Sequence, residues 1–169
     1  IMDSKSKITA YLSDTPPVGT KFDLYINSIK QEELTVLVKE DLKQVIFLDL
    51  AVSPRSNDFV VIKASNNIFI PCKVTMRGYL DKFYYANNEM GIIFNNRKIK
   101  LRLWAPTAKQ VELLLYNDVF TVQNHPDFNF VMQHEVVNGT HYIEIDAPEF
   151  ESKYYLYRLH FDDLDNHGR

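Results

Sequence analysis

The stretch Lys98–Tyr116 reads KIKLRLWAPTAKQVELLLY, and it decides the fold of the chain. In its first seven residues, each aliphatic side chain stands between two that are charged or aromatic. This period of two is typical of a β-strand with one buried face. Pro106 then interrupts the pattern, because proline cannot donate a hydrogen bond to a strand ladder, and a second alternating run follows over 111–116. Two strands joined by so short a connection predict the centre of a β-sandwich.

Alternating segments separated by turn signals predict strands along the rest of the chain, with no sustained helical period. In the first half we expect strands over 7–12, 21–29, 34–38, 44–52, 59–63 and 68–75. In the second half we expect them over 83–85, 92–94, 98–104, 111–116, 130–137, 141–145 and 154–161, with a short edge strand over 118–123. Asn138-Gly139 is a strong hairpin signal between two of these strands. The strand over 154–161 is expected to close the sandwich, with Tyr155, Tyr157, Leu159 and Phe161 on one face.

A boundary over 76–82, marked by Gly78 and a charged pair, divides the chain into two domains. We expect a small N-terminal β domain over residues 1–80 and a second β domain over residues 81–169. The apolar content of 46% indicates a globular chain, and 169 residues are enough for two small domains that each bury a core. The fold class is therefore predicted to be all-β.

Composition argues against several classes of function. The net charge is −3, whereas a nucleic-acid-binding protein usually carries a basic excess that neutralises phosphates, so we expect no nucleic-acid partner. No apolar run approaches the roughly 18 residues that span a bilayer, and no hydrophobic signal core follows Ile1–Lys5, so we expect a cytoplasmic protein with no membrane partner. Cys72 is the single cysteine and lies in an apolar segment without a cationic neighbour, so we expect it to be buried and structural.

The motif Trp104-Ala105-Pro106-Thr107-Ala108, followed by a Val-Glu-Leu strand, resembles the N-terminal β-sandwich of the glycoside hydrolase family 13 debranching enzymes. That sandwich is a carbohydrate-binding module of family 48. Phe83-Tyr84-Tyr85 and Gly91, just upstream, are similar to type I pullulanases, and 8–12 resembles the start of their small N-terminal domain. The resemblance covers roughly residues 81–163 and implies an immunoglobulin-like β-sandwich for the second domain. It implies a structural role for five motif residues, which are Gly91, Trp104, Ala105, Pro106 and Ala108.

No catalytic or metal-binding constellation is expected. Family 13 hydrolases carry their catalytic carboxylates on a (β/α)₈ barrel, and this chain has no alternating strand-helix pattern, so we expect no catalytic residues and no cofactor. The run 162–167 contains aspartates and a histidine, with His160 nearby, but it lacks the glycine turn and the terminal glutamate of a calcium loop. The histidines show no ligand spacing, so we expect no metal site.

Trp104 and Tyr116 are the candidate carbohydrate-binding residues, and two interpretations of Trp104 stay open. An exposed indole can stack on a pyranose ring, and the polar Lys100 and Arg102 share its strand face. A large ring at the end of a strand can also plug the sandwich or pack between domains, and we favour this second interpretation. Glycogen-binding modules of family 48 use tryptophans in other loops, and Trp104 is the single tryptophan here, so independent tight glycan binding is not expected.

The resemblance implies the non-catalytic N-terminal portion of a pullulanase-like enzyme that hydrolyses α-1,6 branch points in pullulan, glycogen or starch dextrins. The implied partners are the catalytic barrel of the same parent chain and an α-glucan. Two alternatives remain. One is a free-standing α-glucan-binding module, and the other is a regulatory interaction domain like the family 48-like modules of kinase complexes.

Overall fold

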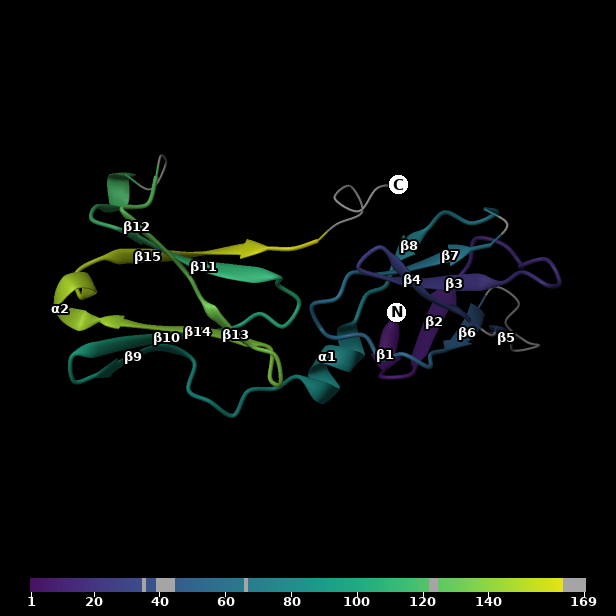
Figure 1. The fold of residues 1–169 in the computed structure, drawn as a ribbon, viewed down its shortest axis with the longest axis horizontal. Helices are drawn as coiled ribbons and strands as arrows, with labels where there is room; N and C mark the ends of the chain where they lie inside the picture. The colour runs from purple at the N-terminus through teal and green to yellow at the C-terminus, as the bar shows by residue number, and fades with distance from the viewer. Residues whose placement is uncertain (35, 39–44, 66, 122–124, 163–169) are drawn as a thin grey trace. The chain divides into compact units, whose positions relative to one another are not determined.

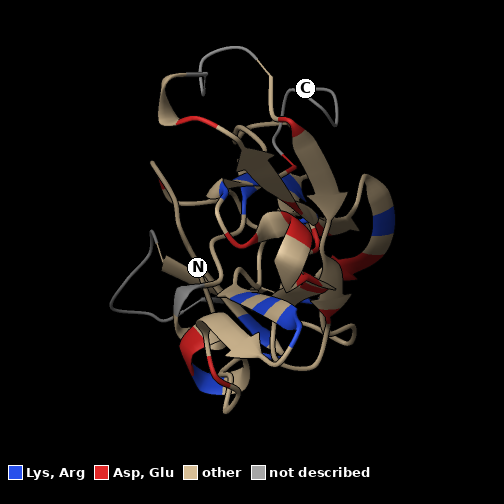
Figure 2. Cartoon of the chain, turned by 90° about the vertical axis from the view of Figure 1, so that its left-hand side faces the viewer, with Lys and Arg blue, Asp and Glu red and all other residues tan. Residues whose placement is uncertain are grey.

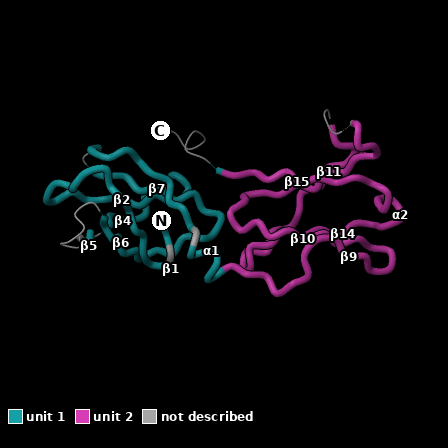
Figure 3. The backbone as a smooth tube through the Cα atoms, turned by 180° about the vertical axis from the view of Figure 1, so that it is seen from behind, with its two compact units in different colours: residues 1–83, 162–169 teal, residues 84–161 magenta. Residues whose placement is uncertain are grey.

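The computed structural model describes residues 1–34, 36–38, 45–65, 67–121 and 125–162. These residues form two compact units, one over residues 1–83 together with Asp162 and one over residues 84–161 (Figures 1 and 3). Strands dominate both units, which confirms the all-β class. The first unit ends at Phe83, whereas the sequence predicted a boundary after residue 80, and the division into independent domains stays a prediction. No helix in the described ranges is long and apolar enough to cross a membrane.

Within its described residues, the first unit consists of two antiparallel four-stranded sheets and one short helix. The strand order is β1-β2-β6-β5 in one sheet and β4-β3-β7-β8 in the other. The elements are β1 (Met2–Ser4), β2 (Lys7–Tyr11), β3 (Phe22–Ile26), β4 (Ile29–Leu34), β5 (Val36–Val38), β6 (Val45–Asp49), β7 (Val60–Ala64), β8 (Cys72–Lys73) and α1 (Arg77–Phe83). Side chains that alternate along β3 and β6 supply its core, as the period of two in the sequence predicts.

Several expectations for individual segments of this region are wrong. The predicted strand over 68–75 shrinks to β8, which pairs with β7 alone among the described strands, and Cys72 is exposed. The segment 76–82, predicted as the boundary between domains, forms α1, which buries Tyr79, whose hydroxyl donates to the carbonyl of Pro54 at 2.8 Å. The strand predicted over 83–85 is absent, since Phe83 ends the helix.

Within its described residues, the second unit consists of a four-stranded sheet of order β13-β14-β10-β9 and a three-stranded sheet of order β12-β11-β15. The strands are β9 (Gly91–Asn95), β10 (Lys98–Trp104), β11 (Gln110–Tyr116), β12 (Phe128–Val131), β13 (Gln133–Glu135), β14 (Thr140–Asp146) and β15 (Tyr154–His160). Two helical turns, η1 (Val119–Thr121) and α2 (Ala147–Phe150), replace an expected edge strand and part of an expected loop. Residues 122–124 of that expected edge strand lie outside the described residues.

The two sheets of the second unit share one apolar core. Strands β10 and β11 belong to different sheets, as the stretch Lys98–Tyr116 predicts, and their inward side chains meet. The buried residues of this core are Ile99, Leu101, Ala105, Ala108, Val111, Leu113, Leu115, Met132, Ile145, Ala147 and Phe150. The ring of Phe150 in α2 packs edge-on against two phenylalanines of β12, with centroids 5.1 and 5.5 Å away. This burial is the main source of stability for the unit.

The segment 130–137, expected as one strand, changes sheets in its middle. Its first part ends β12 in the three-stranded sheet, and its second part contains β13 in the four-stranded sheet. Met132 alone separates the two strands, is 4% exposed, and donates its N–H to the carbonyl of Val111 at 2.8 Å. A strand that switches sheets in this way closes one side of a sandwich.

The strand β15 differs from its expected role in closing the sandwich. Its register with β11 places Tyr155, Tyr157 and Leu159 on the core face, as predicted. Tyr157 is the only one of these three that is not exposed, and burial raises the pKa of its hydroxyl to about 12. Tyr155 and Leu159 stay 41% and 37% exposed, and Phe161 beyond the strand is 52% exposed.

The connection between β10 and β11 fits closely against the turn between β13 and β14. The Ala105 N–H donates to the carbonyl of Gly139 at 3.1 Å, and the Ala108 N–H donates back to the Ala105 carbonyl at 3.1 Å. Gly139 has a φ of +70°, and a side chain there would bring a Cβ within 2.9 Å of the Cα of Pro106. Glycine at this position is therefore required both by its backbone conformation and by the contact with Pro106.

We expect Gly139→Ala to lower the free energy of unfolding of the second unit by about 2 kcal/mol or more, because strain at positive φ adds to overlap with Pro106. The matched control is Gly91→Ala, which also has a positive φ, of +82°, but meets nothing within 4 Å. We expect the control to cost about 1 kcal/mol. Urea unfolding followed by Trp104 fluorescence measures both, and equal losses would contradict the contact with Pro106.

Candidate functional site

The outer face of the four-stranded sheet in the second unit carries the candidate site. The alternation along β10 turns Lys98, Lys100, Arg102 and Trp104 outward. Their cross-strand partners on β14 are Asp146, Glu144, Tyr142 and Thr140, and β13 adds Glu135 beside Thr140. The result is a polar sheet face that has one large aromatic side chain at the end of β10. Figure 2 marks both basic and acidic residues along the described part of the ribbon.

Trp104 lies at the end of β10 and is 41% exposed. Its side chain does not belong to the apolar core, which lies on the opposite face of the strand. Tyr142, the other ring on this face, is partly buried, and the guanidinium of Arg102 lies 4.8 Å from its ring centroid. The Lys100 ammonium lies 5.7 Å from the same centroid. The Tyr142 ring therefore makes cation–π contacts with Arg102 and Lys100, whereas the Trp104 indole is exposed to solvent.

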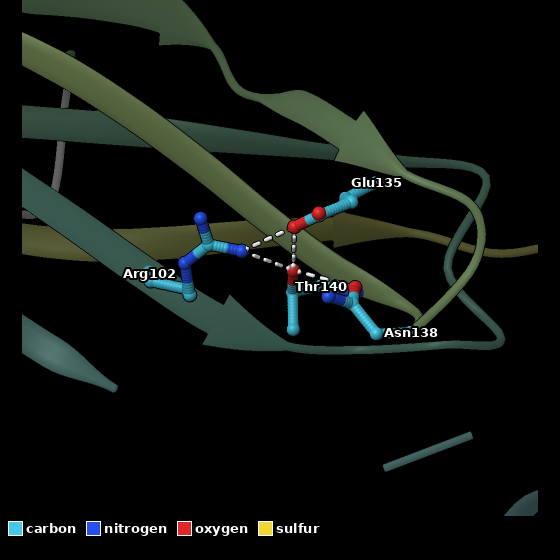
Figure 4. A network of polar contacts seen from close by, with 4 residues as sticks. All are labelled: Arg102, Glu135, Asn138 and Thr140. Atoms are coloured by element: carbon cyan, nitrogen blue, oxygen red, sulfur yellow. Dashed lines mark hydrogen bonds and ion pairs between the residues drawn. The ribbon is translucent and has the colours of Figure 1, made fainter. Parts of the chain in front are cut away.

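A hydrogen-bonded network joins side chains of β10, β13, β14 and the turn between β13 and β14 (Figure 4). The Arg102 guanidinium donates from Nη1 to Glu135 Oε2 at 2.5 Å and to Thr140 Oγ1 at 2.7 Å. Thr140 Oγ1 lies 2.9 Å from Asn138 Oδ1 and 3.2 Å from Glu135 Oε2, and its single hydrogen is donated to one of them at a time. The Thr140 N–H also donates to Asn138 Oδ1 at 3.0 Å. This network holds β10, β13 and the hairpin turn together.

The burial of Arg102 and the ionisation of Glu135 depend on several strands, so the sequence of one strand could not predict them. The sequence indicated only that Arg102 is a polar residue on the strand face of Trp104, and the residue is 7% exposed because Glu135, Thr140 and the Tyr142 ring surround it. The hydrogen bond from Arg102, supported by those from Asn138 and Thr140, holds the pKa of the Glu135 carboxyl below its ordinary value. Glu135 is therefore ionised at neutral pH, and its side chain is 39% exposed. Trp104 and Glu135 both pair with Thr140, from opposite sides of β14. A carboxylate with this exposure can accept hydrogen bonds from a polyhydroxylated ligand.

Tyr116, the second sequence candidate, lies on the other sheet. It is paired with Tyr154 on the outer face of β11 and β15 and is only 3% exposed. Trp104 and Tyr116 are thus on different sheets, and the structure does not bring them together. The ring of Tyr116 is not presented to solvent, so the surface around Trp104 is the better candidate.

The outer face of the three-stranded sheet has a polar cluster of its own around Glu112. This residue is 8% exposed and accepts hydrogen bonds from Asn129 Nδ2 at 2.9 Å and from His160 Nε2 at 2.7 Å. The Arg158 guanidinium lies 3.4 Å from the same carboxylate. The hydrogen bond with His160, followed by that from Asn129, lowers the pKa of Glu112. Because each group has a partner within the sheet, we interpret this cluster as structural.

A pair of histidines that the sequence did not reveal faces the interior of the sandwich. His134 on β13 and His141 on β14 are direct cross-strand partners, with rings stacked at 4.3 Å and only 4° apart in angle. His141 is fully buried, and neither of its ring nitrogens has a partner of normal hydrogen-bond geometry among the described residues. Burial, together with the charge that His134 can carry, lowers the pKa of His141 to about 4, although the Ala105 backbone opposes the shift. Burial also lowers the pKa of His134.

The histidine pair does not make a metal centre. Among the residues that the structure describes, no group of three or more His, Cys, Asp or Glu side chains is arranged to hold a metal ion. In the acidic run that the sequence singled out, only Asp162 is described, and 163–167 lie outside the described residues. The motif residues Ala105, Pro106 and Ala108 are buried, and Gly91 begins β9 with a positive φ. The structural roles that the resemblance implies for them stay predictions.

Comparison with known proteins places this fold. No family model matches the chain. Among solved structures, Group B Streptococcus pullulanase SAP with maltotetraose matches with a TM-score of 0.71 and 16% identity, over 96% of this chain and 21% of that chain. The chain has the fold of a segment of the pullulanases. The pullulanase of Anoxybacillus sp. LM18-11 with maltotetraose gives a TM-score of 0.63 at 20% identity, over 94% of this chain and 22% of that one.

The type I pullulanase of Bacillus subtilis str. 168 with maltose is similar in the same way, with a TM-score of 0.60 and 18% identity over 95% of this chain and 22% of that one. Because each match covers nearly the whole chain, it includes both compact units. The chain spans about a fifth of the length of these pullulanases. The resemblance to their N-terminal portion therefore holds at the level of the fold.

We expect Thr140→Val to lower the free energy of unfolding by about 1–3 kcal/mol, because it removes an acceptor from the buried Arg102 and keeps the side-chain shape. Thr107→Val is the matched control, since Thr107 is exposed, and it should change that free energy by less than about 0.5 kcal/mol. Trp104 fluorescence in urea measures both variants. A neutral Thr140→Val would show that the network contributes nothing to stability.

The histidine pair predicts a loss of stability on mild acidification. His141 stays neutral in the folded chain down to about pH 4, whereas the unfolded chain binds its proton near the ordinary value of 6.5. The free energy of unfolding is therefore highest above pH 6.5 and falls as the pH drops toward 4, by up to roughly 1.4 kcal/mol per pH unit for each proton taken up.

Urea unfolding at pH 7.0, 6.3 and 5.6 measures this slope in a range in which most carboxylates stay ionised. His141→Phe should flatten it, because the variant has no proton to bind on unfolding. His125→Gln, at an exposed position, should leave it unchanged. An identical slope in wild type and His141→Phe would contradict the assignment.

Proposed function

We propose that the chain is the non-catalytic N-terminal portion of a pullulanase-like enzyme, which hydrolyses α-1,6-glucosidic branch points in pullulan, glycogen or starch dextrins. The observation that carries the proposal is the similarity of the fold to pullulanases over 92–96% of this chain. The motif Trp104–Ala108 and the upstream aromatic cluster support it independently. In this proposal the partner is the catalytic barrel of the same parent chain, and the two β units serve as its scaffold. The second unit is proposed to be a family 48-like carbohydrate-binding module, and cytoplasmic localisation stays a prediction.

We further propose that the surface around Trp104 contacts an α-glucan. An indole that is 41% exposed offers a flat apolar surface for a pyranose ring, and the ionised Glu135 and the Asn138 amide lie in the adjoining network for its hydroxyls. Two of the similar pullulanases were solved with maltotetraose, which makes this oligosaccharide the natural probe. A free-standing glucan-binding module is the alternative, and the same exposed indole would serve it.

The proposal of a scaffold with a glucan surface predicts no hydrolysis by residues 1–169 alone. Purified chain incubated with pullulan should release no reducing sugar above the buffer control, because in this proposal the pair of catalytic carboxyls lies on the barrel of the parent chain. The complete product of the gene should release maltotriose from pullulan. Hydrolysis by residues 1–169 would contradict the scaffold role, and an inactive complete product would favour the free-standing module.

Calorimetric titration with maltotetraose tests the glucan surface. Trp104→Ala should weaken binding roughly three- to tenfold, in line with the loss of one aromatic contact worth about 1 kcal/mol. The matched control is Phe120→Ala, because Phe120 is 88% exposed in the same unit and lies on η1, outside the Trp104 face. Equal affinities for the wild type and both variants would move the site away from Trp104. If no heat is measured up to millimolar maltotetraose, the glucan surface is contradicted and only the scaffold role remains.

A further inference from the structure

The sandwich of the second unit is closed on one side and open on the other. On the closed side, the chain passes from β12 to β13 through Met132, so the edges of the two sheets are joined covalently. The strands at the opposite edges are β9 and β15. Within the described residues, β9 pairs with β10 alone and β15 pairs with β11 alone, so each has a free edge.

Four apolar side chains on these edge strands belong to the core faces of their sheets but remain exposed. Ile92 and Phe94 of β9 stand opposite the buried Leu101 and Ile99. Tyr155 and Leu159 of β15 stand opposite the buried Leu115 and Val111. Their exposed fractions are 37% for Ile92, 62% for Phe94, 41% for Tyr155 and 37% for Leu159. We call these four residues the open margin.

The strand β15 lacks the features by which natural proteins protect an exposed edge. It is seven residues long, has no proline and no lysine, and its register with β11 has no bulge. Its one arginine, Arg158, is engaged with Glu112 on the outer face. An unprotected apolar edge of this length usually has a partner in the assembled protein.

We propose that the open margin is the docking surface for a segment of the parent enzyme outside residues 1–169, which covers the four side chains with apolar side chains of its own. This inference rests on the proposed function. The similar pullulanases are about five times as long as this chain, so most of such a parent lies outside the described residues. The margin has no charged group, and this chemistry suits an apolar protein surface better than a polyhydroxylated glucan.

The test compares the same substitutions in two contexts, residues 1–169 alone and the complete product of the gene. Phe94→Ala and Phe94→Ser change a side chain that is 62% exposed, so in residues 1–169 the melting temperature of the second unit should shift by less than about 2 °C. In the complete protein we expect the same variants to lower it by about 4 °C or more, because they remove covered apolar contacts. Phe120→Ser is the matched control, at an exposed phenylalanine outside the margin, and should be neutral in both contexts.

Hydrogen exchange gives an independent reading of the same surface. Amides of β9 and β15 should exchange at least tenfold more slowly in the complete protein than in residues 1–169, whereas those of the central strand β10 should change little. Margin variants that are neutral in both contexts, with unchanged exchange, would overturn the inference.

Two further outcomes would also overturn it. Margin variants that destabilise residues 1–169 alone, or that dissolve a dimer of this chain, would place the covering surface within these residues or in a second copy. A reading frame that ends at residue 169 would remove both the docking segment and the proposed enzyme. Pullulan hydrolysis by the complete protein separates the two claims, because an active enzyme with neutral margin variants retains the proposed function and loses only the docking surface.

Discussion

The second unit depends on one crossing, in which the chain leaves the four-stranded sheet after Trp104 and enters the three-stranded sheet at Gln110. The crossing is held by the hydrogen bond from Ala105 to the carbonyl of Gly139 and by the close approach of Pro106 to that glycine. The contact ties the connection between sheets to the hairpin that begins β14. It thereby sets the pairing of Trp104 with Thr140, and with it the whole outer face on which the Arg102 network lies. A side chain at residue 139 would disturb the core, the hairpin and the candidate site together.

Strands with one apolar face could be predicted from the sequence. Contacts between side chains of different strands could not be predicted. Alternation within Lys98–Tyr116 correctly identified β10, β11 and their placement in two sheets, because inward and outward positions follow from the period of two. The alternation placed Arg102 on the face opposite the core, but its burial there arises from residues of β13 and the hairpin, which are more than thirty positions away. The switch at Met132 and the stacked His134 and His141 are likewise properties of paired strands and leave no mark on a single one. The helix α1 is too short for a helical period to emerge.

Each outer face of the sandwich carries a carboxylate that accepts hydrogen bonds from other side chains, and the two carboxylates differ in exposure. On each face a carboxylate accepts hydrogen bonds from cationic or amide side chains of neighbouring strands, and its pKa is lowered as a result. Glu112 is enclosed by its partners, so its charge is satisfied within the sheet. Glu135 stands on the edge strand β13 and its side chain is 39% exposed, so its remaining acceptor capacity faces solvent. The difference in exposure, and not in partners, makes one face structural and the other a candidate for ligand contact.

The single-residue switch at Met132 has a consequence for how the second unit folds. Because β12 and β13 are continuous, neither sheet can reach its native register without fixing the position of the edge strand of the other. The hairpins β9–β10 and β13–β14 join residues close in sequence, whereas β10–β14 joins Lys98 to Asp146 and β11–β15 joins Gln110 to His160. Closing such long loops before their contacts form slows folding, so we expect the two local hairpins to form before the long-range strand pairs. The continuous passage from β12 to β13 then couples the completion of one sheet to that of the other.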